Sequence, residues 1–174
     1  MKTIVIYKSK SGYTKTYAEW IAEELKCDLA ENINVSIEKL QDYHTIIYGG
    51  GLYAIGINGI SLITRNFEAI KNKNIIVWAT GSCPGRADEI EGVWKQNFTK
   101  EQRDKMKLFY LRGGFDYKRL SKGDKLLMSM LKMRLKSKKE RSEDEEGLLK
   151  AYDIPEYHCS KDNIRQIVAY VRTL

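Results

Sequence analysis

Short apolar segments that end in loops of glycine, serine and threonine recur along this chain, and they constrain its fold more than any other feature. Segments rich in isoleucine, valine, tyrosine and phenylalanine favour buried strands at 2–7, 45–48, 74–79 and 107–111, with a weaker one expected at 28–32. Because strands buried on both faces lose the alternation of apolar and polar residues, the pattern predicts a parallel α/β sheet with helices on both sides.

The helices between these strands are predicted from the spacing of their apolar residues. The pattern indicates helices at 13–27, at about 60–70, at 87–106 and at 162–174, the last with Ser160 as its cap. A chain of 174 residues has the usual size of one domain, so we expect residues 1–174 to form a single domain.

The loop after the first strand reads Ser9-Lys10-Ser11-Gly12-Tyr13-Thr14 and lies where a helix is predicted to begin. Unpaired N–H groups and the positive end of the helix dipole favour an anion there, and hydroxyl groups can donate to phosphate oxygens. The loop therefore predicts a phosphate site, with helix capping plus a tight turn as the alternative. It matches neither GxGxxG nor GxxxxGK[ST], which disfavours a dinucleotide or nucleoside triphosphate site.

This loop resembles the first loop of the flavodoxin family, T/S-x-T-G-x-T, in which Ser9, Ser11, Gly12 and Thr14 match the pattern. The resemblance covers nearly the whole chain apart from residues 114 to about 150. It implies a flavodoxin-like doubly wound α/β fold with five parallel strands in the order 2-1-3-4-5. It also implies an FMN cofactor that carries electrons. The residues implied to bind the FMN phosphate are Ser9, Lys10, Ser11, Gly12, Tyr13 and Thr14.

By the same resemblance, the loops at 50–56 and 80–86 would enclose the isoalloxazine ring. The residues implied there are Gly50, Gly51, Leu52, Tyr53, Ala54, Thr80, Gly81, Ser82 and Cys83. Tyr53 is the stacking candidate, although a chain with eleven tyrosines can also place one on its surface by chance. Cys83 would lie near the ring, with an incidental loop cysteine as the alternative to a redox role. Electron transfer through a flavin requires no protein acid or base, so we expect no catalytic residue.

The positive charge of the chain is concentrated in one segment. The net charge is +7, and residues 112–141 hold eleven Lys/Arg against three acidic residues, so this segment carries +8 and the rest −1. Three widely spaced cysteines, two histidines and the absence of a CxxC pair disfavour a disulfide framework and a metal site. The segment also lacks interleaved aromatic platforms, which disfavours nucleic acid as a partner.

This basic segment belongs to a long insert, 114–150, placed within the domain after the fifth strand. On a helical wheel of residues 125–136, Lys125, Ser129, Lys132 and Lys136 share one narrow arc and leucine and methionine occupy most of the rest. Three outcomes are open: the apolar face packs on the domain itself, it contacts a partner or a second copy, or it lies on an anionic membrane surface through residues 116–141.

The insert also resembles that of the flavodoxin-type menaquinone-dependent protoporphyrinogen dehydrogenases, through residues 111–117 and 125–132. That likeness implies an alternative function, a membrane-associated dehydrogenase that oxidises a porphyrinogen and passes electrons to a quinone. The other readings are a carrier serving a redox partner protein, and a module without cofactor. The sequence shows no secretory signal or spanning segment, so we expect a cytoplasmic protein. The insert leaves two further possibilities open, a peripheral position at the inner face of the membrane and a homodimer.

Overall fold

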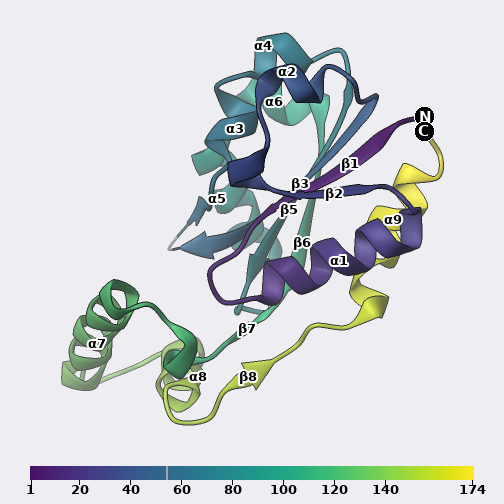
Figure 1. Cartoon of the computed structure of the whole chain (residues 1–174). Coiled ribbons are helices and arrows are strands. Elements are labelled where there is room, and N and C mark those ends of the chain that lie inside the picture. The colour runs from purple at the N-terminus through teal and green to yellow at the C-terminus, as the bar shows by residue number, and fades with distance from the viewer. Residues whose placement is uncertain (54) are drawn as a thin grey trace.

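The computed structural model describes residues 1–53 and 55–174, and it has a parallel sheet between two layers of helices (Figure 1). The sheet consists of β1 (Thr3–Lys8), β2 (Asp28–Glu31), β3 (Thr45–Tyr53), β5 (Asn74–Gly81) and β6 (Met106–Arg112). Its order is β2-β1-β3-β5-β6, which confirms the predicted order of the five parallel strands. A short strand that the sequence did not predict, β4 (Gly56–Ile57), runs antiparallel to the end of β3.

Each face of the sheet has its own hydrophobic core. Val5, Ile47 and Trp78 pack against α1 (Tyr13–Leu25) and α9 (Arg165–Val171). The opposite face packs against α2 (Ile37–Leu40), α3 (Ser61–Thr64), α4 (Phe67–Ile70) and α5 (Ala87–Asn97). The short helix α6 (Lys100–Lys105) precedes β6 and has no apolar side chain. Successive residues of a strand point to opposite faces of the sheet. A strand that is apolar at every position therefore contributes side chains to both cores, as the sequence predicted. Two 3₁₀ turns complete this part, η1 (Asn32–Asn34) and η3 (Lys161–Ile164), the latter capped by Ser160.

Two of the predicted helices are each divided in two. The helix expected at about 60–70 breaks between α3 and α4, where the side-chain amide of Asn66 donates to the carbonyl of Leu62 at 2.8 Å. The helix expected at 87–106 ends at Asn97, and α6 begins after Thr99, whose hydroxyl and Gln102 form a capping box. In both places a polar side chain binds the backbone groups that would continue the helix.

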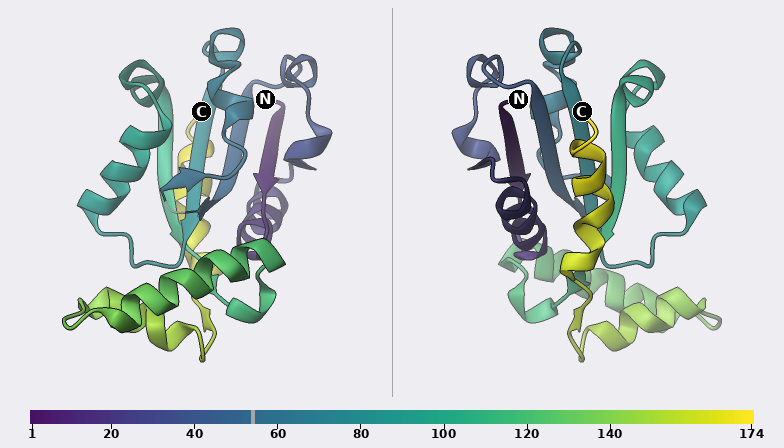
Figure 2. Two further views of the ribbon diagram at one scale, coloured as in Figure 1. Left: turned by 90° about the vertical axis from the view of Figure 1, so that its left-hand side faces the viewer. Right: turned by 90° about the vertical axis from the view of Figure 1, so that its right-hand side faces the viewer.

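The insert forms a lobe of its own after β6. It contains β7 (Gly114–Phe115), η2 (Tyr117–Arg119), α7 (Lys122–Ser137) and α8 (Glu143–Ala151), and it ends at β8 (Glu156–Tyr157), which pairs antiparallel with β7. Figure 2 shows α7 crossing beneath the carboxyl ends of the sheet strands. Helix α7 begins earlier than residue 125 because the Ser121 hydroxyl accepts a hydrogen bond from the Asp124 N–H at 3.2 Å.

The helical-wheel picture of α7 requires a correction. The arc that holds Ser129 and Lys132 faces the rest of the lobe: Ser129 Oγ lies 2.6 Å from the Tyr117 hydroxyl, and Lys132 Nζ lies 4.8 Å from the centre of the Tyr152 ring. The exposed residues of α7 include four apolar ones, with fractional exposures of 57–67% for Leu126, Leu127, Met130 and Met133, and Lys136 of the basic arc is exposed as well. The tyrosines of the lobe, absent from the wheel, decide which face turns inward.

Candidate functional site

The loop between β1 and α1 has the conformation of an open helix N-terminus. Ser9 Oγ accepts a hydrogen bond from the Gly12 N–H at 3.1 Å, which closes a tight turn. Gly12 has φ of 96°, a left-handed conformation that favours glycine, and no side chain caps the helix at this position. The alternative to a phosphate site was a tight turn together with a capped helix. The structure has the tight turn, but no side chain caps the helix.

The carboxyl end of β3 lies against this first loop. The sequence predicted a loop at 50–56, whereas the structure continues the strand to Tyr53 and pairs its last two residues with β4. Thr14 is buried, and a Cβ placed at Gly51 would lie 3.4 Å from its hydroxyl oxygen and 3.5 Å from the Tyr53 ring. A Cβ at Gly50 would meet Ile57 and the backbone of Asn58, so that glycine serves the packing of β3 on β4 rather than a ligand. Ala54, which was also predicted here, lies outside the described residues.

The loop after β5 is the third segment at this carboxyl edge of the sheet. The Gly113 N–H donates to the Gly81 carbonyl at 2.7 Å, and a Cβ at Gly113 would lie 2.7 Å from the Thr80 methyl group. Among the residues that the structure describes, the buried Thr80 hydroxyl has no hydrogen-bond partner. A buried hydroxyl without a partner is costly, so it indicates a polar group that this edge of the sheet can still accept.

Residues that the sequence did not single out hold this third loop. Arg112 Nε donates to the Ser82 carbonyl at 3.1 Å, and the Tyr110 hydroxyl donates to the Cys83 carbonyl at 2.7 Å. Burial raises the pKa of Tyr110, so this phenol stays protonated and keeps donating. Both residues lie on β6, next to β5, and strand adjacency is the signal that could have found them. The side chain of Cys83 itself is exposed.

Tyr13 lies at the start of α1, as the loop prediction places it, and its side chain is directed toward the insert. Its side chain is buried against the pair of strands that flanks the insert, with its hydroxyl donating to the Glu156 carbonyl at 3.3 Å and its ring 5.8 Å from that of Tyr157. Leu52 pairs with Ile57 in the antiparallel extension of β3. Tyr13 therefore joins the first loop to β8, and only its backbone N–H can serve the loop.

Lys10 connects the first loop, the second loop and the insert. Its ammonium lies 3.1 and 3.2 Å from the two carboxylate oxygens of Asp124 and 4.2 Å from the centre of the Tyr53 ring. Burial, with a further contribution from Asp124, raises the pKa of Tyr53 to about 12. The Ser121 hydroxyl and Lys10 hold the pKa of Asp124 below its usual range. No signal in the sequence joins positions so far apart.

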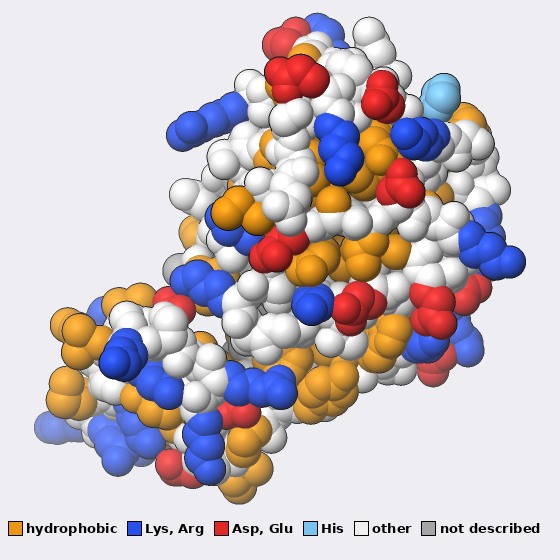
Figure 3. Space-filling model, viewed as in Figure 1, with side chains coloured by type: hydrophobic (Ala, Val, Ile, Leu, Met, Phe, Trp, Pro, Cys, Tyr) orange, Lys and Arg blue, Asp and Glu red, His pale blue; other side chains and the backbone are white. Residues whose placement is uncertain are grey.

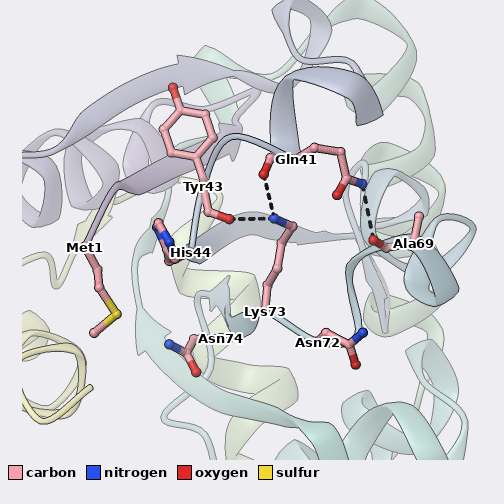
Figure 4. A pocket seen from close by; sticks show the side chains of 8 residues that line it. All are labelled: Met1, Gln41, Tyr43, His44, Ala69, Asn72, Lys73 and Asn74. Carbon is pink, nitrogen blue, oxygen red and sulfur yellow. Dashed lines mark hydrogen bonds between the residues drawn. The ribbon is translucent and has the colours of Figure 1, made fainter.

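A surface hollow lies at the opposite edge of the sheet, around the amino ends of β1, β3 and β5. Its lining residues are Met1, Gln41, Tyr43, His44, Ala69, Asn72, Lys73 and Asn74 (Figure 4). Lys73 Nζ donates to the carbonyls of Gln41 and Tyr43 at 2.8 and 2.7 Å, so the lysine joins two loops. Among the side chains that the structure describes, which leave out residues 54 and 144, no group of three metal-ligating residues is present. The described part of the chain contains no helix long and apolar enough to cross a membrane.

Comparisons with known proteins identify the family of the chain. A model of the flavodoxin domain matches residues 4–143. A relative, the uncharacterized protein MJ0298 of Methanocaldococcus jannaschii, is 31% identical over 109 residues, 62% of this chain and 67% of the relative. Two solved structures are similar: two-electron reduced Megasphaera elsdenii flavodoxin (TM-score 0.47, 15% identity, 63% of this chain and 84% of that one) and a WrbA-like flavodoxin from Agrobacterium tumefaciens (TM-score 0.46, 17% identity, 61% and 74%). Since the domain model matches most of the sequence, the chain belongs to the flavodoxin domain family.

Proposed function

We propose that this flavodoxin-type redox protein binds one FMN at the carboxyl edge of its sheet and transfers electrons through it. The observation that carries the proposal is the meeting of three loops there, one offering an uncapped helix N-terminus and another the partnerless hydroxyl of Thr80. The two features suit the two ends of the cofactor. A helix N-terminus attracts phosphate, and a buried donor suits a polar ring edge.

The residues present fit this cofactor in distinct ways. Ser11, Thr14 and the backbone of the first loop would hold the phosphate, while Ser9 keeps the loop in shape through Gly12. The loops that contain Gly51–Tyr53 and Thr80–Cys83 would enclose the ring. Bound FMN supplies one- or two-electron redox chemistry, and the chain orients it and excludes water. Arg112 and Tyr110 would fix the third loop by holding its carbonyls.

The proposal predicts that the purified protein retains one FMN per chain. Protein incubated with FMN and desalted at micromolar concentration should show the absorption bands of flavin in a one-to-one ratio to the chain. A chain that loses all FMN on desalting would contradict the proposal, because a phosphate site with several charge-assisted donors should bind more tightly than that.

For the partner of the insert, the outer face of α7 favours an anionic membrane surface. Leu126, Met130 and Met133 lie along the exposed side of the helix, with Lys122 and Lys136 on one flank and Arg134 on the other. Figure 3 shows hydrophobic and basic side chains gathered on this lobe, at lower left. An apolar stripe with cationic flanks suits the interface of an anionic bilayer. A homodimer through this face would place like charges together.

The porphyrinogen dehydrogenase remains a second candidate function, favoured only by the position of the insert beside the proposed flavin edge (Figure 2). This candidate function predicts that the FMN-loaded protein oxidises protoporphyrinogen with menaquinone as the electron acceptor. A carrier would instead exchange electrons with a protein partner and leave the porphyrinogen unchanged. Turnover with these two substrates distinguishes the candidates without assuming either.

A further inference from the structure

The ion pair between Lys10 and Asp124 lies across the site proposed for FMN. Lys10 comes from the first loop, Tyr53 from the second and Asp124 from the first turn of α7. The ammonium occupies a position 4.2 Å from the centre of the Tyr53 ring while both carboxylate oxygens hold it. The three side chains thus bring together two cofactor loops and the insert.

We propose that this ion pair makes the site selective for phosphorylated flavin, so that Lys10 is a specificity-determining residue and Asp124 its positioning residue. The inference rests on the proposed FMN function. In the ligand-free chain, Asp124 holds Lys10 over the Tyr53 ring. A phosphate at the first loop draws the ammonium away, and the ring face becomes free.

The ion pair excludes unphosphorylated flavin by steric overlap. An ammonium in contact with one face of an aromatic ring and a flat ligand stacked on that face require the same space. A flavin without phosphate can reach this face of Tyr53 only by separating Lys10 from Asp124, and it offers the ammonium no anion in return. Its affinity is therefore reduced by the free energy of the ion pair and of the cation–π contact.

Electrostatic attraction allows phosphorylated flavin to bind. A phosphate carries more negative charge than a carboxylate, and Lys10 belongs to the loop whose N–H groups would bind it. The lysine stem is flexible, so its ammonium can exchange one anion for the other without movement of the backbone. Asp124 stays in place during the exchange because the Ser121 hydroxyl donates to its Oδ2 at 2.7 Å. Phosphorylated flavin thus regains what the opening costs.

The test compares affinities for FMN and riboflavin, measured by quenching of flavin fluorescence in the full chain. Lys10→Ala should tighten riboflavin about three- to thirtyfold, since the variant removes both the exposed ion pair and the cation–π contact that riboflavin must otherwise break. The same variant should weaken FMN about tenfold, since it loses a charge-assisted contact to phosphate. The ratio of FMN affinity to riboflavin affinity therefore falls, because one affinity decreases and the other increases.

Asp124→Asn provides the second variant, because it releases Lys10 but keeps its charge. It should tighten both ligands severalfold. The matched control is Asp153→Asn, which removes an equal charge from another ion pair of the lobe, Lys132–Asp153 at 3.4 Å, and should change neither affinity.

The outcomes separate this inference from the function on which it rests. Riboflavin affinity that is unchanged or weaker in Lys10→Ala, or FMN affinity that is weaker in Asp124→Asn, would overturn the selectivity proposal while FMN binding by the parent still stands. A parent chain that binds neither ligand would overturn both proposals.

Discussion

At the scale of single residues, the hydroxyls of the first loop have separate tasks although the sequence presents them alike. Ser9 is used inside the loop, where its oxygen accepts from the Gly12 N–H. Thr14 is buried beside Gly51, and Ser11 is half-buried. The sequence predicted the loop but could not assign these tasks, because they depend on the turn that Gly12 makes. Ser11 and Thr14 have no such task within the loop, and the Ser9 hydroxyl can still donate its own proton.

We expect Ser11→Ala and Thr14→Ala each to weaken FMN about 10- to 100-fold. Each change removes a hydroxyl donor to a charged phosphate, worth about 1.5–3 kcal/mol. Fluorescence titration measures the effect, and riboflavin is the control ligand because it has no phosphate. Riboflavin should bind each variant as it binds the parent; an equal loss for both flavins would show that these hydroxyls do not hold phosphate.

At the scale of helices and strands, the sequence predicted the sheet well and the insert poorly, for physical reasons. Strands buried on both faces are apolar at nearly every position, so 45–48 and 74–79 could be found without knowledge of their neighbours. For a helix such as α7, with one face on the lobe and the other exposed, the sequence alone does not show which face is buried. The wheel of α7 showed a basic arc and an apolar arc, but Tyr117 and Tyr152, from other parts of the insert, hold Ser129 and Lys132 on the inner side.

The same limit applies to the site. The sequence indicated its three loops, since each follows a strand, but not Asp124, Arg112 or Tyr110. These residues act through contacts made across the fold: Arg112 and Tyr110 reach the third loop from a neighbouring strand, and Asp124 reaches Lys10 from the insert. The family resemblance could not supply Asp124, because residues 114 to about 150 lay outside it, and its loop pattern did not include the β6 residues Tyr110 and Arg112.

A close approach between β3 and β5 gives a prediction about stability. Gly49 is the direct neighbour of Trp78 in the sheet, and a Cβ at Gly49 would overlap the buried indole. Gly49→Ala should lower the free energy of unfolding by about 1–3 kcal/mol, since the core must shift to admit the methyl group. Urea denaturation monitored by circular dichroism measures it.

The matched control is Gly147→Ala in α8, where the added Cβ meets no atom within 4 Å. There the methyl group costs no packing, and alanine is the better helix former by about 1 kcal/mol. This variant should be as stable as the parent or slightly more so. A Gly49→Ala variant of unchanged stability would show that the Trp78 indole has room to move.

At the scale of the whole molecule, charge and cofactor edge lie on the same side. The segment 112–141 carries +8 while the remainder is near neutral, and Lys10 joins it to the first loop through Asp124. The helix that carries the exposed Leu and Met residues crosses beneath the carboxyl ends of the strands (Figure 2). A surface bound through α7 would therefore lie close to the proposed flavin, which suits electron exchange with a partner in or on that surface.

We expect the protein to co-sediment with anionic vesicles at low ionic strength and to be released by salt, with little binding to neutral vesicles. Basic residues near an anionic bilayer contribute about 1 kcal/mol each, and salt screens this attraction. Lys122, Arg134 and Lys136 changed together to Glu should abolish binding, whereas Lys26, Lys39 and Lys100 changed to Glu, equal in charge but outside the insert, should weaken it less.

The apolar contribution of α7 requires its own variant, because charge reversal alone would also weaken binding to an acidic protein. The double variant Leu126→Asp with Met130→Asp alters two residues that are 67% and 57% exposed, so the fold should keep its stability. Vesicle binding should weaken, because two apolar side chains that would be buried in the membrane interface are lost. Circular dichroism and sedimentation on the same samples separate the two effects. If this double variant unfolds, the face of α7 packs against the protein itself. If the variant folds and still binds anionic vesicles as tightly as the parent, only charge holds the insert to the membrane, and the leucine and methionine face serves another partner.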